Sequence, residues 1–441
     1  MPATSLHVIV IGGGIGGLCL AQALKAADFS VAVYERNLAS TWPEGYRIHI
    51  NPVGSRALHE CLPVALWDAF VATAGKPPAG LGFLTEQLEE LVVIGEEFMS
   101  NKTGSPIDAH YPVNRIALRQ VLLAGLQDVI QFDKTFERYQ QTTGGKVTAF
   151  FVDGTSASGD VLVAADGANS RVRKQFLPHA QRVETGAAGI GGKLLLTEQA
   201  RAWLPRQLLS RMNLTMPPSR YTLFNAAFDH APMSADARRR IGLVAQAIGL
   251  SPDRLIDNSQ EYMLWAFIAP ADAYPPDADS LDGRALQRFV GQMIAAWHPD
   301  LRRLVAESDP GSMSFNPFKT MAPVAPWAST NVTLLGDAIH NMPPVGGLGG
   351  NMALRDASLL ARKLMAVQCS ELSLLSAIQE YEAEMRAYGF AAVKAVLENT
   401  QLATSGNRIA REVGKTWFRL CNAVPPLKRA FEERWTRPMR I

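Results

Sequence analysis

Three glycines near the start of the chain are spaced as a phosphate-binding turn requires. Gly12, Gly14 and Gly17 stand in VIVIGGGIGGLCLAQAL, after a strand-like run and before a helical pattern. The first permits a tight turn, the second lets backbone approach a pyrophosphate, and the third lets helix and strand pack closely. The free N–H groups of the helix would face the phosphates. Glu35 ends the next strand-like run, where a carboxylate can bind ribose hydroxyls. These residues predict a dinucleotide site without separating NAD from FAD.

Two later stretches carry a resemblance that separates NAD from FAD. DVLVAADGANSRVRKQF runs from a buried strand into Asp-Gly, and TLLGDAIHNMPP contains Gly336-Asp337. In these motifs the chain resembles the single-component, class A flavoprotein monooxygenases of the aromatic-hydroxylase type. The second fingerprint of that family, D-G-x-x-S-x-x-R after a strand, is complete here as Asp166, Gly167, Ser170 and Arg173. All three fingerprints occur in the family's order, so the resemblance implies FAD.

The resemblance implies a role for each matching residue. Asp337 would bond a ribityl hydroxyl of the flavin, and Arg115 would contact the ribityl–pyrophosphate region. Asp166 and Gly167 would support the cofactor from the middle of the domain, and in the family they are also linked to the nicotinamide nucleotide. Arg36, beside Glu35, could stack near the adenine or equally stand in solvent.

A proline–glycine stretch, NMPPVGGLGGNMALRDA, would form the backbone wall beside the flavin ring. The prolines keep the approach extended because their φ angle is fixed. The resemblance places Pro344 beside the site where the flavin C4a-hydroperoxide forms. Asn351 is expected to cap the following helix, whose positive end would favour reduced flavin. Four glycines would let main-chain N–H groups reach the flavin: Gly346, Gly347, Gly349 and Gly350.

Three further polar residues are candidates for the active site. Arg47 and His49 alternate in GYRIHINPVGSRAL, so they share one strand face, pointing either toward the active site or toward solvent. We favour Arg47 as the catalytic candidate of the two. His340 follows the Gly-Asp motif, and a structural role is favoured for it over that of a catalytic base.

Composition excludes several other classes of protein. The chain has 441 residues, 47% of them hydrophobic, and a formal net charge of +2, which gives no reason to expect nucleic acid as a partner. Its four cysteines are widely separated, and no metal-binding motif occurs, so no metal site is expected. The N-terminal apolar run is broken by glycines and lacks a basic start, and no run of about 20 apolar residues follows. We therefore expect a cytoplasmic protein.

The elements that must position these residues indicate an α/β fold. Strand, helix and strand over residues 7–35 form a βαβ unit, which implies a parallel sheet of Rossmann type. Strand-like runs with polar or proline-rich connections predict a mostly antiparallel substrate sheet, followed by C-terminal helices. The expected FAD-binding parts are 1–181, with a short substrate-domain excursion at about 78–112, and 321–370. The substrate sheet is expected at 182–320 and the C-terminal helical region at 371–441.

The last thirty residues are basic and aromatic, which allows two interpretations. They could form an interfacial membrane anchor, or a helix packed on the FAD domain. Pro425-Pro426 and the two glutamates of FEERW favour the packed helix. The aromatic residues concerned are Trp417, Phe418, Phe431 and Trp435.

The resemblance also implies a reaction. NAD(P)H, bound transiently, would reduce FAD, and the reduced flavin would combine with O2 to give the C4a-hydroperoxide that oxygenates the substrate. No second G-x-G-x-x-G follows another strand, as expected when no separate nicotinamide domain exists. The apolar strands of 182–320 suit an aromatic or polycyclic apolar substrate, hydroxylated or epoxidised, and the chain is similar to monooxygenases of secondary metabolism. The alternative is an FAD-dependent reductase or dehydrogenase on the same fold. The protein is expected to be a monomer or homodimer.

Overall fold

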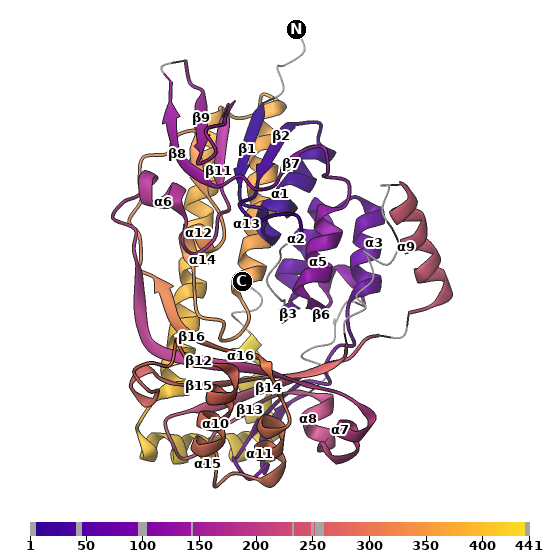
Figure 1. Cartoon of the computed structure of the whole chain (residues 1–441), viewed down its shortest axis with the longest axis vertical. Helices are drawn as coiled ribbons and strands as arrows, with labels where there is room; N and C mark the ends of the chain where they lie inside the picture. Colours follow the sequence, from indigo (N-terminus) through magenta and orange to yellow (C-terminus); the bar gives the residue numbers. More distant parts are fainter. Residues whose placement is uncertain are drawn as a thin grey trace.

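A parallel sheet forms the upper part of the computed structural model (Figure 1). The structure describes residues 6–40, 46–95, 104–142, 144–231, 233–247, 251 and 260–436. The strand order in the sheet is β17–β11–β1–β2–β7, and the register pairs β1 in parallel with both β11 and β2. The central runs HVIVI and VLVA are almost wholly buried, as expected of parallel strands covered on both faces. The strands are β1 (His7–Ile11), β2 (Ser30–Tyr34), β7 (Ile130–Gln131), β11 (Val161–Ala164) and β17 (Val332–Leu334).

Helices and two small sheets surround this parallel sheet. The helix α13 packs against both α1 and α2, and a three-stranded sheet of β8, β9 and β10 lies beside β1 and β11. The strands β3 and β6 form a separate antiparallel pair that points toward the lower sheet (Figure 1). The helices are α1 (Ile15–Ala26), α2 (Pro52–Cys61), α3 (Val64–Thr73), α5 (Arg115–Leu123), α6 (Arg171–Phe176), α12 (Asp337–His340) and α13 (Gly349–Gln368), with the 3₁₀ turn η1 (Pro106–Asp108). The strands are β3 (Arg47–Ile50), β6 (Tyr111–Asn114), β8 (Phe136–Gln141), β9 (Val147–Phe151) and β10 (Ser156–Gly159).

A seven-stranded sheet in the order β16–β12–β15–β14–β13–β4–β5 forms the lower part. Neighbouring strands are antiparallel except β13 and β4, which pair in parallel. Two of its strands, β4 and β5, come from residues 81–94 and lie within the stretch expected to leave the FAD-binding part. The strands are β4 (Leu81–Leu84), β5 (Glu90–Ile94), β12 (Arg182–Leu195), β13 (Met212–Thr215), β14 (Thr222–Phe228), β15 (Tyr262–Pro270) and β16 (Asp309–Met321).

The two faces of the seven-stranded sheet differ. On β15, Met263, Trp265 and Phe267 are buried in a core shared with the covering helices. The alternate residues Leu264 and Ala266 are only partly buried and lie on the opposite face, because successive strand side chains point to opposite sides. The helices covering the first face lie below the sheet in Figure 1: α7 (Glu198–Trp203), α8 (Arg206–Ser210), α10 (Gly283–Met293) and α11 (Pro299–Ala306), with the 3₁₀ turn η3 (Ala271–Ala273).

One segment between residues 182 and 320 lies away from this sheet. The helix α9 (Ala235–Ala247) packs on α3, at the side of the parallel-sheet part (Figure 1). Its residues Ile241 and Ala245 are buried in the same core as Phe70 of α3. The apolar positions of this helix recur at four-residue spacing, which matches one helix face.

The last two helices, α15 (Arg408–Ala423) and α16 (Pro425–Thr436), pack on the seven-stranded sheet, so the expectation that the C-terminal residues pack on the FAD domain was wrong. Phe418 of α15 and Phe431 of α16 lie 4.9 and 5.9 Å, between ring centroids, from Phe83 of β4. The physical reason is that β4 and β5 end the sheet and expose an apolar face that needs a cover. Trp417 remains 47% exposed, and the side chain of Trp435 lies outside the described residues. The preceding helix, α14 (Leu374–Thr404), packs mainly on α13 in the parallel-sheet part.

Among the described residues, no helix combines the length and the apolar character needed to cross a membrane.

Candidate active site

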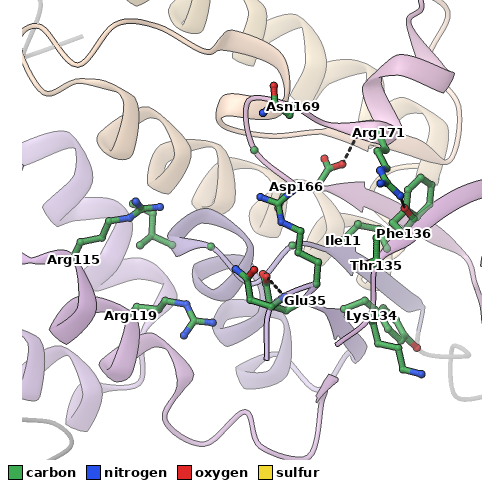
Figure 2. Close-up of a pocket in the computed structure, with 18 of the residues that line it drawn as sticks. Ile11, Glu35, Arg115, Arg119, Lys134, Thr135, Phe136, Asp166, Asn169 and Arg171 are labelled. Carbon is green, nitrogen blue, oxygen red and sulfur yellow. Dashed lines mark hydrogen bonds between the residues drawn. The ribbon is translucent and has the colours of Figure 1, made fainter. Parts of the chain in front are cut away.

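A cavity of about 470 Å³ opens where β1, β2 and β11 end. This edge of an open α/β sheet is the usual place for a ligand. Figure 2 shows Arg115 and Arg119 entering it from one side, opposite Lys134 and Phe136. Seven of the residues predicted to bind the cofactor line it: Gly12, Gly14, Glu35, Arg36, Arg115, Asp166 and Gly167.

The three glycines of the first motif have different surroundings. A Cβ on Gly12, whose φ is +110°, would lie 2.3 Å from the carbonyl oxygen of Ala165, and a Cβ on Gly17 would lie 2.2 Å from that of Gly12. A Cβ on Gly14 would meet no protein atom within 4 Å. Gly12 and Gly17 therefore serve the packing of the protein, whereas Gly14 keeps space in the cavity open. This is the space that a diphosphate approaching the backbone would fill.

The backbone around the cavity is arranged to receive an anion. The helix α1 begins after Gly14 without a side-chain cap, so its first N–H groups have no partner within the helix. Glu35, only 6% exposed, accepts hydrogen bonds from the N–H groups of Gly13 (2.7 Å) and Asn37 (2.9 Å). A carboxylate has about four acceptor positions, so ribose hydroxyls can still bind to it. Both features fit the FAD implied by the motifs.

Arg119 is a cavity residue that was not predicted as a cofactor contact. It is buried, and its Nε donates to the carbonyl oxygen of Gly13 at 3.0 Å. Burial lowers the pKa of Arg119 to about 9, while Glu35 nearby raises it. Its position one turn after Arg115 on the same helix face was the signal in the sequence. With Lys134 and Lys174 also lining the cavity, the charge suits a diphosphate.

The Asp-Gly fingerprint organises the backbone beside the cavity. Asp166 accepts hydrogen bonds from the N–H groups of Arg171 (2.8 Å) and Val172 (3.4 Å), at the start of α6. Burial raises the pKa of Asp166, and these bonds lower it in part. Arg173 donates from Nη1 to the carbonyl oxygen of Ala338 at 2.8 Å. The second fingerprint thereby holds the third one, because Ala338 follows Asp337.

A buried network holds the Gly-Asp turn. Gly336, with φ of +62°, donates its N–H to Asp356 Oδ2 at 2.6 Å, and His340 Nε2 lies 2.7 Å from the same oxygen. Tyr388 donates its hydroxyl to Asp356 Oδ1 at 2.6 Å. His340 and Asp356 are both inaccessible to solvent, so His340 acts here through structure. Asp337 itself is exposed, lies outside the cavity lining, and stays a prediction as a flavin contact.

Asn351 was predicted to cap the helix after the proline–glycine stretch, and that prediction was wrong. The helix α13 already begins at Gly349, with Leu348 at the capping position. The Asn351 side chain donates to the carbonyl oxygens of Gly347 (2.9 Å) and His49 (2.8 Å) and accepts from the N–H of Asn51 (2.9 Å). Three bonds, two of them long-range, outweigh the single bond that a cap would make. Asn351 therefore joins the glycine loop to the end of β3.

The loop before α13 lies between the two sheets. Pro343 is buried, Pro344 is exposed, and Gly346 and Gly347 have φ angles of +83° and +64°. Val345 packs against a small apolar cluster on the seven-stranded sheet, formed by Ala187, Ile268 and Phe318. Gly350 follows in the first turn of α13, where a Cβ would lie 3.2 Å from Ile15 Cδ1 at the start of α1.

The two residues predicted to share one face of β3, Arg47 and His49, differ in burial and in charge. Arg47 is buried at 7% exposure, whereas His49 is partly buried and lies 2.7 Å (Nε2 to Nδ1) from His110. Burial lowers the pKa of His49 well below its ordinary value, and the charges of His110 and Arg47 add to this. Burial also lowers the pKa of His110 to about 4. Both imidazoles are therefore neutral at neutral pH, which leaves Arg47 as the cationic residue of this strand.

Comparison with known proteins decides the family. A crystal structure of a candidate FAD-containing monooxygenase from Photorhabdus luminescens is 36% identical, with a TM-score of 0.79, over 91% of this chain and 99% of that one. The chain belongs to the FAD-dependent monooxygenases. A family model described as an FAD binding domain matches residues 278–396, and a model described as an NAD(P)-binding Rossmann-like domain matches residues 10–41. The predicted family, Rossmann-type fold and FAD are confirmed.

Two curated monooxygenases illustrate the range of this family. The dual O-methyltransferase/FAD-dependent monooxygenase CTB3 of Cercospora beticola is 32% identical over 87% of this chain. The chain spans 44% of the length of that relative. The FAD-dependent urate hydroxylase of Klebsiella pneumoniae is 28% identical, over 86% of this chain and 85% of its own length.

Replacing the two arginines of α5 should separate cofactor binding from stability. Arg115→Ala is expected to weaken FAD binding about 10-fold by removing one phosphate contact, with the melting temperature of the FAD-free protein unchanged. Arg119→Ala should weaken FAD binding and also lower the free energy of unfolding by about 1–3 kcal/mol, because the carbonyl oxygen of Gly13 loses its donor. Fluorescence titration with FAD and thermal melts of the FAD-free variants measure both effects. Equal melting behaviour of the two variants would contradict the role given to Arg119.

Proposed function

We propose that this chain is an NAD(P)H-dependent monooxygenase that inserts one oxygen atom of O2 into an aromatic or polycyclic substrate, by hydroxylation or epoxidation. One observation carries the proposal: the helices α1 and α13 begin side by side, with Ile15 of α1 next to Gly350 in the first turn of α13. A ligand whose diphosphate lies on α1 would extend toward the start of α13. The loop before α13 reaches the seven-stranded sheet through Val345.

The chain's own residues would hold and orient the cofactor. The N-terminus of α1 and the arginines of α5 would bind the diphosphate, and Glu35 the ribose. Arg36 would lie near the adenine, and Asp166 and Gly167 would support the middle of the cofactor. Asp337 remains our proposed ribityl contact. FAD, when bound and reduced by NAD(P)H, supplies the electrons that activate O2 at its C4a position.

The glycine loop would form the backbone wall beside the flavin ring. Main-chain N–H groups of Gly347, Gly349 and Gly350 are our proposed contacts with the ring edge, and Pro344 would border the reacting side. Asn351 acts by holding this loop against β3. The N-terminus of α13 would favour negative charge on the ring by up to about 1–2 kcal/mol.

The seven-stranded sheet would bind the substrate and exclude water. Its upper face carries partly buried apolar residues, and the cluster below Val345 closes it toward the loop. We propose the same division of the chain as the sequence indicates. Residues 1–181 and 321–370 bind FAD, with an excursion at about 78–112; residues 182–320 bind substrate, and residues 371–441 are the C-terminal helices.

The relatives support a role in modifying existing compounds. The Klebsiella relative is a urate hydroxylase, and the Cercospora relative joins a monooxygenase to an O-methyltransferase in one chain. Methylation and oxygenation both decorate a carbon skeleton that is already built. We therefore place the reaction in secondary metabolism.

Isotope labelling tests this function directly. The FAD-loaded protein is mixed with NADPH or NADH, a panel of aromatic and polycyclic compounds, and ¹⁸O2. We expect at least one compound to accelerate NAD(P)H oxidation and to gain a single ¹⁸O atom. A product that is reduced or dehydrogenated without ¹⁸O would instead establish the alternative, an FAD-dependent reductase or dehydrogenase.

A further inference from the structure

A buried arginine that has no hydrogen-bond partner among the described residues lies between the two halves of the molecule. Arg47 is 7% exposed, and within the described part of the chain its guanidinium makes no hydrogen bond. Its Nε and Nη2 atoms are fully buried. An arginine presents five donors, and burying that charge unpaired is costly. Such a group is maintained where a ligand completes it.

Within the described part of the chain, negative charge lies near Arg47, but no acceptor forms a hydrogen bond with it. Burial lowers its pKa to about 10, while Tyr262 and Asp229 raise it, so the guanidinium is charged at neutral pH. Asp229 is already bonded to Arg201 Nη2 at 2.6 Å, and the same nitrogen bonds Glu261 at 2.8 Å. Arg201 therefore supplies one positive charge to these two carboxylates, and Asp229 acts on Arg47 through its remaining charge and not through a hydrogen bond.

A second cation lies on the same side of the seven-stranded sheet. The Nζ atom of Lys193, on β12, is 4.8 Å from the ring centroid of Tyr46 and 5.0 Å from that of Tyr262. Tyr46 directly precedes Arg47, and Tyr262 interacts with the charge of Arg47. The two cations thus share aromatic neighbours, and positive charge gathers where β3 faces the sheet.

An apolar surface connects this positively charged end to the loop before α13. Along β15, Tyr262, Leu264 and Ala266 lie on one face because strand side chains alternate. Ala266 packs against the same apolar cluster as Val345 of the loop. Four residues of strand span about 13 Å, so the charged end and the loop are about the length of three fused rings apart.

We propose that the substrate is a polycyclic aromatic compound with an acidic group, a carboxylate or an ionised hydroxyl, that binds the guanidinium of Arg47. This rests on the proposed function and specifies the substrate expected from the sequence: it is apolar along its rings and anionic at one end. A planar guanidinium binds an oxyanion with two parallel hydrogen bonds, which fixes the orientation of the rings. Arg47 is then a binding and specificity residue, with the reacting carbon held near the loop.

Binding of matched acid and neutral probes tests the proposal. Isothermal titration of the FAD-loaded protein compares anthracene-2-carboxylate with its methyl ester, and 2-hydroxyanthracene with 2-methoxyanthracene, which distinguishes the two kinds of acid. We expect the protein to bind one acid roughly 30-fold or more tightly than its neutral partner. Arg47→Gln should lose this preference, Arg47→Lys should keep part of it, and Arg302→Gln, an exposed arginine of α11, should keep all of it.

Stability of the variants gives an independent measurement. Arg47→Gln should melt no lower than the unsubstituted protein without ligand, because it removes a buried charge that makes no hydrogen bond within the described structure. Three binding results would overturn the proposal: equal affinity for acids and neutral partners, no binding of either acid, or an Arg47→Gln variant that loses FAD affinity while keeping the acid preference. Oxygenation of neutral compounds alone would overturn it and leave the proposed function standing. Acid binding that depends on Arg47, without ¹⁸O incorporation into any compound, would support the binding site and contradict the proposed function.

Discussion

Gly14→Val is expected to lose FAD binding while the protein stays folded. The backbone at Gly14, with φ of −76° and ψ of 179°, suits a branched side chain, and no protein atom lies within 4 Å of the added Cβ. The valine would instead fill the space of the diphosphate. Losing two hydrogen bonds to that charged group forfeits about 3 kcal/mol, so FAD should bind about 100-fold more weakly or worse.

A neighbouring glycine provides the matched control for Gly14. Gly17→Ala adds a single methyl group that would lie 2.2 Å from the carbonyl oxygen of Gly12, so backbone must move. We expect it to lower the free energy of unfolding by about 3 kcal/mol. Thermal melts with and without excess FAD distinguish the variants: Gly14→Val should melt like the FAD-free protein and gain nothing from FAD, whereas Gly17→Ala should melt lower in both conditions. A Gly14→Val protein that retains FAD would refute the assignment of Gly14 to the diphosphate site.

Asp356→Ala is expected to destabilise the protein strongly and to weaken FAD binding. The variant leaves His340, the N–H of Gly336 and the hydroxyl of Tyr388 without their shared acceptor, all in the buried interior. Removing one member of a buried ion pair costs about 3–5 kcal/mol. FAD affinity should fall because the turn that presents Asp337 loses its anchor. Denaturant unfolding and FAD titration measure the two effects. Tyr388→Phe, which removes one of the three bonds, should cost only about 1 kcal/mol.

The pH dependence of stability isolates the charge of this pair. Burial alone would lower the pKa of His340, but the charge of Asp356 and their hydrogen bond raise it above the ordinary 6.5. The folded protein therefore holds a proton that the unfolded chain releases near pH 6.5. The resulting stabilisation is fully present below pH 6.5 and is lost as the pH rises through the folded pKa. In Asp356→Asn this decline should shrink, and an identical decline in both proteins would contradict the pairing.

Short segments determined the nucleotide-binding half of the site. Gly12, Gly14 and Gly17 lie within six residues of one another on one strand–turn–helix unit, so backbone geometry alone specifies their roles. Glu35 follows from the same βαβ unit, because the register of adjacent parallel strands places it beside the turn. The role of Arg119 could have been predicted from its helical spacing to Arg115 for the same reason, although only Arg115 was predicted to contact the cofactor.

Longer-range contacts changed the local predictions elsewhere. Asn351 reads locally as a helix cap, but Asn51, 300 residues away, and the carbonyl oxygen of His49 bind its side chain. The sequence around the C-terminal aromatic residues does not identify the element they pack on, because the strand that they cover lies far away at residues 81–84. Asp356 and Tyr388 show no motif, since their role depends on reaching a turn that another element forms.

The sequence by itself determined that the chain binds FAD on a Rossmann-type domain and belongs with monooxygenases. Those features depend on residues close together in the chain, whose spacing expresses their geometry. Only the tertiary structure decided which residues lie between the two sheets. Arg47, Lys193, Tyr262 and Val345 come from four separate segments, and folding alone brings them together between the sheets. Burial of a charge depends on every neighbour, so the lack of a hydrogen bond to Arg47 within the described residues is a property of the folded molecule.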